Sequence, residues 1–300
     1  MAVVGAMRRS LRQLGRDASP PQRLAYVVGA VLIGVGLVHL LGFAVLGGPW
    51  VGPVAWRKPF AFGVSFGLTT VTLAWLSGYQ HLGRRLQWWL LAPLAGANTS
   101  EVAWVGVQRA RGVASHFNFD TTLDAALFVG GGVAIVVTVA VILTLTVGSF
   151  GRVDGPAGMA VAMRTGLVCL VIAQLAGGLM IYQGIIAVEA GAAQLTTWGD
   201  AGIMKVPHAV GIHGIQALPG LAWLLSFSAF DVGRRRMIAA AASGGYAGIV
   251  AVSVIQTLSG LAPWDLTAIT GPVLVVSLAG FCGAAVAALV GLRGARPALA

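Results

Sequence analysis

The sequence predicts an all-α polytopic membrane protein with eight transmembrane helices, arranged as two parallel four-helix repeats, with both termini in the cytoplasm. Three observations lead to this prediction: the composition, the positions of the basic residues and an internal similarity. Of the 300 residues, 57% are hydrophobic and only 9% are charged, and the mean hydropathy is +0.87. Because charged residues make up about a quarter of an ordinary soluble domain, this chain is expected to reside in a bilayer.

Eight stretches are apolar and long enough to cross a bilayer, which takes about 20 residues. They are residues 24–46, 59–79, 87–108, 123–148, 165–188, 208–230, 237–260 and 267–291. The chain then divides into a basic cytoplasmic arm (1–23), a first repeat (24–148), a cytoplasmic linker (149–164), a second repeat (165–292) and a cytoplasmic tail (293–300). The arm carries five arginines and leads into a full-length span without a cleavage pattern, so we expect it to be retained.

Lys and Arg are distributed unequally between the two sets of alternate loops. Fourteen of them fall on one side of the predicted membrane and five on the other. The five are Arg57, Lys58, Arg109, Arg111 and Lys205. The positive-inside rule places the richer side in the cytoplasm. The net charge of +10 is thus explained by membrane topology, and no nucleic-acid partner is expected.

Ala, Gly, Val and Arg are abundant and Lys is scarce, which is typical of a high-GC bacterial genome. The expected location is therefore a bacterial plasma membrane. The cysteines, Cys169 and Cys282, both lie within predicted spans and have no CxxC spacing, so neither a disulfide nor a thiolate metal site is predicted.

Residues 59–76 and 207–224 resemble each other, with seven identities in eighteen positions at an offset of 148. The shared pattern is Pro-x-Ala-x-Gly-x9-Leu-Ala-Trp-Leu. Four spans return the chain to its starting side, so the two copies would have the same orientation. Chance matching of small apolar residues is the alternative. Because His208 and His213 replace Phe60 and Ser65 in the later copy, the difference between the copies indicates a site.

Ionisable side chains are rare within spans, because each costs about 2.5–3.5 kcal/mol at the bilayer centre and needs a partner or a wet cavity. His39, Glu101 and His213 are all expected about 8–11 Å beneath the exterior surface, at 1.5 Å per residue. If their helices face one another, they can meet. Two imidazoles and a carboxylate would suit a divalent metal, and Glu101 and His213 are the candidate catalytic residues.

Haem b is the other candidate cofactor, since histidines on facing helices can supply both axial ligands. Its candidate ligands are His39, His116, His208 and His213. Shallower polar residues would form a mouth for the substrate, namely Gln108, Arg111, Asn118, Asp124 and Gln216. Alternatively, Glu101 conducts protons or ions, or it only pairs with Arg109, Arg111 or a histidine to satisfy a buried charge.

The favoured function is a haem- or metal-binding membrane redox protein or enzyme acting on an unknown small molecule or quinol, because four of the five histidines share the exterior side. The alternatives are a small-solute or ion transporter coupled to protons and a non-catalytic membrane subunit or sensor. A homo-oligomer is compatible with the sequence. The four-plus-four layout is similar to that of haem A synthase at the level of the fold, although neither the second nor the eighth span opens with a histidine.

Overall fold

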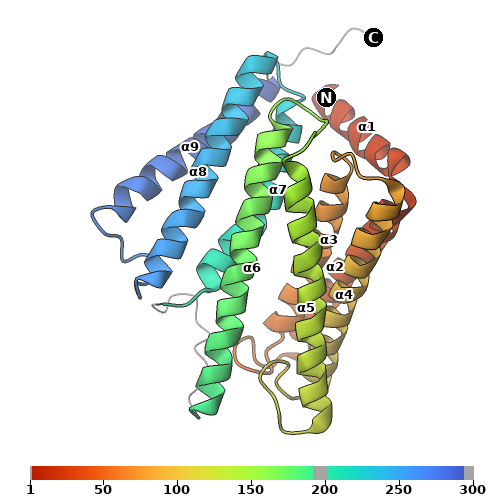
Figure 1. The fold of residues 1–300 in the computed structure, drawn as a ribbon, viewed down its shortest axis with the longest axis vertical. Helices are drawn as coiled ribbons and strands as arrows, with labels where there is room; N and C mark the ends of the chain where they lie inside the picture. Colours follow the sequence, from red (N-terminus) through yellow and green to blue (C-terminus); the bar gives the residue numbers. More distant parts are fainter. Residues whose placement is uncertain (1, 192–201, 294–300) are drawn as a thin grey trace.

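The structure, a computed structural model, describes residues 2–191 and 202–293, and all regular structure within them is α-helical (Figure 1). The described helices are α1 (Ala2–Asp17), α2 (Pro20–Leu46), α3 (Arg57–Ser77), α4 (Arg84–Ala110), α5 (Thr122–Ser149), α6 (Met159–Glu189), α7 (Lys205–Leu225), α8 (Val232–Leu258) and α9 (Thr270–Arg293). The end of α9 and the start of α1 lie at the same end of the bundle (Figure 1), which we term the terminal end, and the opposite end is termed the far end.

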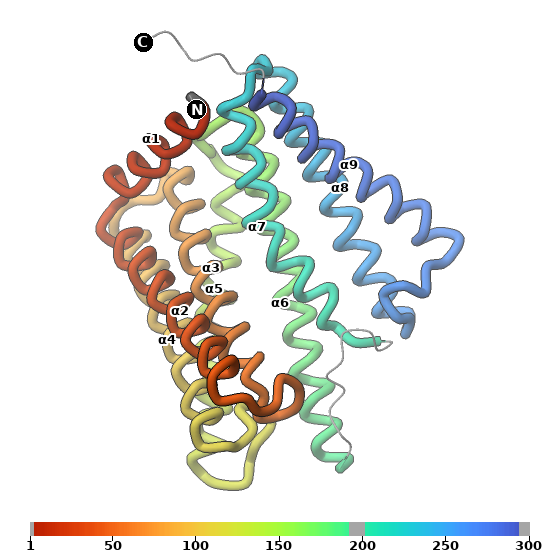
Figure 2. The backbone as a smooth tube through the Cα atoms, turned by 180° about the vertical axis from the view of Figure 1, so that it is seen from behind, coloured from red at the N-terminus to blue at the C-terminus, as the bar shows by residue number. Residues whose placement is uncertain are grey.

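Six of these helices, α2, α3, α5, α6, α8 and α9, are long and apolar enough to cross a membrane. The chain therefore has the character of a multi-pass membrane protein. Helices α4 and α7 overlap the other two predicted spans and run alongside the six in the bundle (Figures 1 and 2). They are 27 and 21 residues long, so it is their polar composition that separates them from the other six.

The basic arm contains a helix that the sequence analysis did not anticipate. Helix α1 ends at Asp17, and a short corner connects it to α2. At this corner the backbone N–H of Ser19 donates to Oε1 of Gln22 at 2.9 Å, and the Ser19 hydroxyl donates to Gln87 in α4 at 2.7 Å. Gln22 Nε2 donates in turn to the carbonyl of Ala74 in α3 at 2.8 Å. The corner is thus anchored to both neighbouring helices, which fixes where α1 leaves the bundle.

Helices α2 and α3 approach each other through glycines, and so do α6 and α7. A Cβ atom added at Gly63 would lie 2.6 Å from Cα of Gly36 in α2. At the matching position of the later segment, a Cβ at Gly211 would lie 2.7 Å from the carbonyl oxygen of Cys169 in α6. Small residues allow membrane helices to pack with their backbones in near contact, and both pairs use this arrangement.

Two apolar cores lie one on each side of α6, which contributes to both. The first core joins α3, α4 and α5 to Met163, Leu167 and Leu170 of α6. The second joins α7, α8 and α9 to the opposite side of α6, through residues that include Met159 and Cys169. Helices α8 and α9 form a pair that diverges from the rest of the bundle (Figure 2). We term α2–α5 the first half and α6–α9 the second half. Helix α6 therefore connects the first half to the rest of the second half.

A further connection between the halves lies at the terminal end. Gln80, after α3, forms an isolated antiparallel bridge with Val153, in the segment that joins α5 to α6. Arg164 of α6 donates to the carbonyls of Ser149 at 2.8 Å and Gly151 at 3.1 Å. The guanidinium group thus satisfies carbonyls at the C-terminal end of α5, where a cation is also favoured by the helix dipole.

The Gly63 contact predicts a position-specific loss of stability. Gly63→Ala forces a methyl group against the backbone of Gly36, which has no side chain that could move away. We expect a destabilisation of about 1–3 kcal/mol, seen as a lower melting temperature in detergent. Gly34→Ala in α2 is the control, because nothing lies within 4 Å of its added Cβ. Equal melting temperatures for the two variants would contradict the close approach of α2 and α3.

Candidate functional site

The site is built around a buried carboxylate, Glu101, whose residue is only 2% exposed. Glu101 lies in the C-terminal half of α4, and Trp104 follows it one turn later on the same face. The indole Nε1 of Trp104 donates to Oε2 of Glu101. Trp104 itself lies against α5, where a Cβ at Gly131 would be 2.9 Å from the indole. The absence of a side chain at Gly131 therefore allows Trp104 to reach the position from which it holds Glu101.

The imidazole of His116 covers the same indole. His116 belongs to the loop between α4 and α5, and its ring stacks on Trp104 with centroids 4.8 Å apart and an interplanar angle of 24°. Phe62 and Phe128 meet the imidazole edge-on at 5.5 and 6.3 Å. Burial, and then the charge of Lys58, hold the pKa of His116 well below its ordinary value. The imidazole is therefore neutral at pH 7, and the aromatic rings around it form an uncharged wall of the site.

Lys58, in the first turn of α3, brings a positive charge to this wall. Its ammonium group interacts electrostatically with Glu101, with His116 and with Lys205 of α7. Within the described residues, the ion pairs closer than 4.0 Å are His81–Asp154, Arg111–Asp124 and Arg152–Asp154. The ammonium group of Lys58 thus interacts electrostatically with the carboxyl group of Glu101 without forming a direct ion pair, and aromatic rings lie beside this carboxyl group.

The loop that carries His116 is held against α6 by its neighbour Phe117. Phe117 has a φ of +56°, in the left-handed region that costs a residue with a side chain about 1–2 kcal/mol. Its ring lies against α6, where a Cβ at Gly184 would be 2.3 Å from the Phe117 ring. This contact, made far along the chain, is what compensates for the unfavourable backbone angle. The loop therefore forms a cover over Trp104 that is attached to the second half of the bundle.

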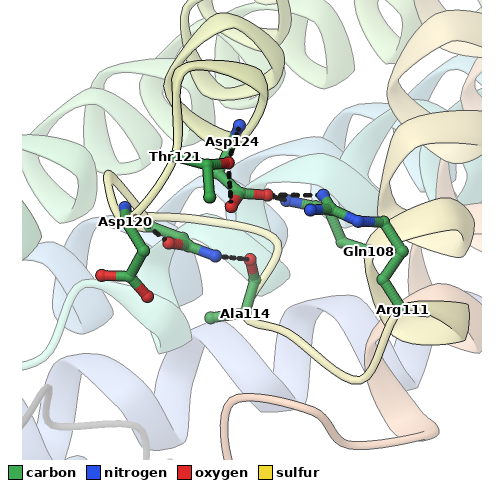
Figure 3. A network of polar contacts seen from close by, with 7 residues as sticks. Gln108, Arg111, Ala114, Asp120, Thr121 and Asp124 are labelled. Atoms are coloured by element: carbon green, nitrogen blue, oxygen red, sulfur yellow. Dashed lines mark hydrogen bonds and ion pairs between the residues drawn. The ribbon is translucent and has the colours of Figure 1, made fainter.

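Most of the expected mouth residues hold this loop and its flanking helices together (Figure 3). Asp124 accepts hydrogen bonds from Gln108 at 2.7 Å, from Arg111 at 2.5 Å and from the Thr121 hydroxyl at 2.6 Å. Arg111 also donates to the side-chain oxygen of Gln108. In the loop itself, Asn118 donates to the carbonyl of Ala114 at 3.3 Å and accepts from the N–H of Asp120 at 3.1 Å. These side chains connect the end of α4 to the start of α5 and are already occupied by one another.

A similar connection joins α8 to α9 in the second half. Gln256, near the end of α8, accepts from the hydroxyl of Thr270 at 3.0 Å and donates to the carbonyl of Asp265 at 2.8 Å. Gln256 is 148 positions after Gln108, the offset of the repeated segment. In both halves a glutamine side chain thus joins the third helix to the fourth. Its partner is the charged Asp124 in the first half and the neutral Thr270 in the second.

Below Glu101, a neutral polar group lies in the middle of the first half. Asn98, which is fully buried, donates to Thr70 of α3 at 2.8 Å and accepts from Thr138 of α5 at 2.9 Å. Asn98 and Glu101 are three residues apart and are neighbours on α4. The three hydrogen-bonding side chains therefore continue the polar face of α4 toward the terminal end.

A cavity of about 250 Å³ lies at the terminal end of this half. Its lining includes Gln22, Tyr26, Trp75 and Tyr79 from the first half, together with Ser10, Gln13, Leu14, Asp17 and Ala18 of α1 and its corner. An apolar layer separates the cavity from the Asn98 group. Its fully or almost fully buried side chains come from three helices and are Leu73, Leu76, Leu91, Leu94, Ile142 and Leu145.

The predicted set of His39, Glu101 and His213 is not assembled in the structure. Among residues 2–191 and 202–293, no group of three or more His, Cys, Asp or Glu side chains could hold a metal ion. His213 is exposed on α7, whereas Glu101 is buried inside the first half of the bundle. His39 lies at the α2–α4 contact, with its Nε2 atom 3.3 Å from a Cβ placed at Gly106. The three residues were expected at similar depths, but their side chains lie on helix faces that do not meet.

The two remaining candidates have local partners. Nδ1 of His208 is 2.7 Å from the carbonyl oxygen of Ala173 in α6, so this imidazole bridges two helices. The amide of Gln216, with its nitrogen facing the backbone, donates to the carbonyl of Ile212 at 2.9 Å within its own helix. Of the expected site residues, Glu101 and His116 come together. Lys58 and Trp104 also belong to this group, although they were not among the expected site residues. The spacing of Glu101 and Trp104 at i and i+3 could have indicated that these two side chains are neighbours.

Comparisons with protein-family models, with curated proteins and with solved structures find no match to this chain. The function proposed below is therefore argued from the geometry of the residues that surround Glu101. That geometry combines a buried carboxylate, a neighbouring ammonium group and an aromatic wall under a loop attached to α6.

The fit between Trp104 and Gly131 predicts different effects for three adjacent glycines. Gly131→Ala displaces the indole and with it the hydrogen bond to Glu101, so its melting temperature should fall by an amount equivalent to about 1–3 kcal/mol. Gly130→Ala and Gly132→Ala are the controls, since nothing lies within 4 Å of either added Cβ, and they should melt like the original protein. Equal decreases in melting temperature for all three variants would contradict a specific contact between Trp104 and Gly131.

The contact between Phe117 and Gly184 can be tested through the accessibility of the loop. Ser115 is 4% exposed, so a cysteine there should react slowly with a water-soluble maleimide in a Cys282→Ser background, where Cys169 is buried. Gly184→Ala should expel the Phe117 ring and raise the labelling rate at least fivefold. Gly178→Ala, with open space around its added Cβ, should leave the rate unchanged. Slow labelling in both variants would contradict the attachment of the loop to α6.

Proposed function

We propose that this protein is a proton-coupled transporter for a small zwitterionic solute, with Lys58, Glu101 and His116 at its binding site. In this proposal α2 to α9 all span the membrane as two parallel four-helix repeats, and the terminal end faces the cytoplasm of a bacterium. The far end, with Lys58 and the loop of His116, faces the exterior. The positive-inside distribution of Lys and Arg supports this orientation.

The observation that carries the proposal is the pair of opposite charges that are close but not in contact. A charge removed from water is costly unless it is paired and hydrogen-bonded. Glu101 has one donor, the indole of Trp104, and Lys58 has no ion pair among the described residues. A zwitterion would satisfy both, because its anionic group suits the ammonium of Lys58 and its cationic group suits the carboxylate of Glu101. The aromatic wall would pack against the carbon atoms between the two groups.

The polar groups that continue below the site favour transport over a one-sided binding protein. In the first half they run from Glu101 through Asn98 to Thr70, and polar groups occur again at the cavity lined by Trp75 and Tyr79. A transporter needs such groups in both halves of the membrane and an apolar barrier that closes one side at a time. The layer of leucine and isoleucine residues between Asn98 and the cavity suits that barrier. Glu101, next to the Asn98 group, is the proposed proton carrier.

Two paired features support the repeat on which this arrangement depends. Gly63 and Gly211 make the close helix contacts at corresponding positions, and Gln108 and Gln256 join the fourth helix of each half to the third. Two four-helix units, α2–α5 and α6–α9, are the arrangement that rocking motions use. For a haem or metal centre, by contrast, the described residues supply no convergent set of His, Cys, Asp or Glu donors.

Binding and transport can be tested with the detergent-purified protein and with proteoliposomes. We expect alanine, proline or glycine betaine at millimolar concentration to raise the melting temperature, and acetate or ethylamine alone to do so less. Lys58→Met and Glu101→Gln should each abolish the shift, while Glu189→Gln, which alters an exposed carboxylate, should preserve it. In liposomes loaded with a pH-sensitive dye, the stabilising solute added outside should drive protons out of the lumen, because its cationic group and the proton compete for Glu101, and Glu101→Gln should remove this flux.

Three results would reject the proposal. Stabilisation by acetate equal to that by the zwitterions would indicate an anion site at Lys58 alone. Solute uptake that persists undiminished in Glu101→Gln would exclude this residue as the proton carrier. A Soret band in the purified protein, lost in variants of its histidines, would indicate the redox function instead. The melting temperature of each variant should be measured as well, so that a loss of binding or uptake can be told apart from a loss of folded protein.

A further inference from the structure

Helix α1 is attached to the bundle along one side only. The indole of Trp223 in α7 donates to the Ser10 hydroxyl at 3.2 Å, and Arg23 of α2 donates to the carbonyl of Arg16 at 2.8 Å. Ser10 and Leu14, one turn apart, both line the 250 Å³ cavity. This side of α1 therefore forms the outer wall of the cavity, and the helix lies across the terminal end (Figures 1 and 2).

The opposite side of α1 carries a dense positive charge. Arg8, Arg9, Arg12 and Arg16 are all exposed. At 100° per residue they fall within a sector of about 100°. Asp17 is the acidic residue of this helix, and it lies outside the sector and lines the cavity. The outer face of α1 is thus a purely cationic surface with no acidic partner on its own helix.

Exposed apolar side chains lie between the cationic sector and the side attached to the bundle. Val4 and Leu11 are 54% and 57% exposed, and as positions i and i+7 they lie on one line along the helix. Neither is needed for packing against the bundle. A helix with such an apolar edge beside clustered arginines has the composition of helices that lie in the plane of the membrane interface.

The position of α1 along the bundle is that of a membrane interface. Helix α2, which is apolar enough to span a bilayer, begins only three residues after α1 ends. At the same end, Trp88 and Trp89 are 41% and 75% exposed in the first turns of α4. Exposed tryptophans at the ends of spans are typical of the headgroup region. Val4 and Leu11 can therefore contact acyl chains at a depth where the arginines contact phosphates.

We propose that α1 is an interfacial helix that binds the phosphate groups of anionic phospholipids through Arg8, Arg9, Arg12 and Arg16. Its apolar edge, Val4 and Leu11, enters the outer acyl region, and the bound lipids keep the helix over the cavity. Each arginine near an anionic surface strengthens such binding about fivefold. The partner is recognised by charge complementarity between the four guanidinium groups and a negatively charged lipid surface. This inference concerns the outer side of α1 and does not depend on the proposed transport.

The test uses the full-length protein in nanodiscs, with a spin label at Leu11→Cys in a Cys282→Ser background. In nanodiscs that contain 30% phosphatidylglycerol, we expect the label to be at least threefold more accessible to oxygen than to a water-soluble nickel relaxant. In pure phosphatidylcholine the preference should disappear. Arg8→Gln with Arg12→Gln should abolish it in the anionic nanodiscs, and 0.5 M KCl should weaken it.

Arg84→Gln with Arg85→Gln is the matched control, since it removes two exposed charges at the same end of the bundle. This variant should retain the oxygen preference in full. A label that stays in water in every nanodisc would overturn the proposal and identify the arginines as a solvated face. Equal loss in the control, or restoration by 10 mM inorganic phosphate in pure phosphatidylcholine, would overturn it as well. The melting temperature of each variant confirms that the bundle is folded.

Discussion

The burial of the Glu101 carboxylate is the constraint on which the arrangement of the first half depends. A carboxylate inside an apolar bundle must be enclosed by groups that hydrogen-bond to it or carry the opposite charge. Helix α4 therefore lies among α2, α3 and α5 and exposes little of its polar face to the surroundings. The same requirement explains why α4 falls short of the six strongly apolar helices in composition. The polar face of α4 points into the bundle, because its exposure to lipid would be energetically unfavourable.

The enclosure of Glu101 depends on residues of other helices, far from α4 in the sequence. Trp104 reaches the carboxylate only because Gly131 leaves room for the indole on α5. His116 covers the indole only because Phe117 adopts a positive φ and lodges against Gly184 of α6. The site is thus completed by a contact between the two halves of the bundle. A movement of α6 relative to α5 would disturb the cover first, which is the coupling that a transport cycle requires.

Hydrophobic length predicted the positions of α2 to α9, and the depth of Glu101 within its span correctly indicated a buried group. Depth did not predict which histidine would lie near Glu101, because of two side chains at equal depth one can point toward the carboxylate and the other away from it. His213 is exposed for this reason, whereas His116 reaches Trp104 from a loop whose path no helical periodicity specifies. Apolar length does not predict helix α1, which is short and rich in arginine. The pattern that indicates it is the segregation of four arginines from Val4 and Leu11.

The two halves share helix packing but differ in charge, and this difference bears on the number of sites. At the offset of 148, Lys58, Glu101 and Trp104 correspond to Val206, Ile249 and Val252. The second half retains the neutral Gln256 to Thr270 connection, where the first half has Gln108 with Asp124 and Arg111. On the proposed repeat, the first copy therefore carries Lys58 and Glu101, and the second copy has apolar residues at the corresponding positions. One proton-carrying carboxylate, Glu101, is sufficient to couple one proton to one solute, and a second carrier would require its own enclosure.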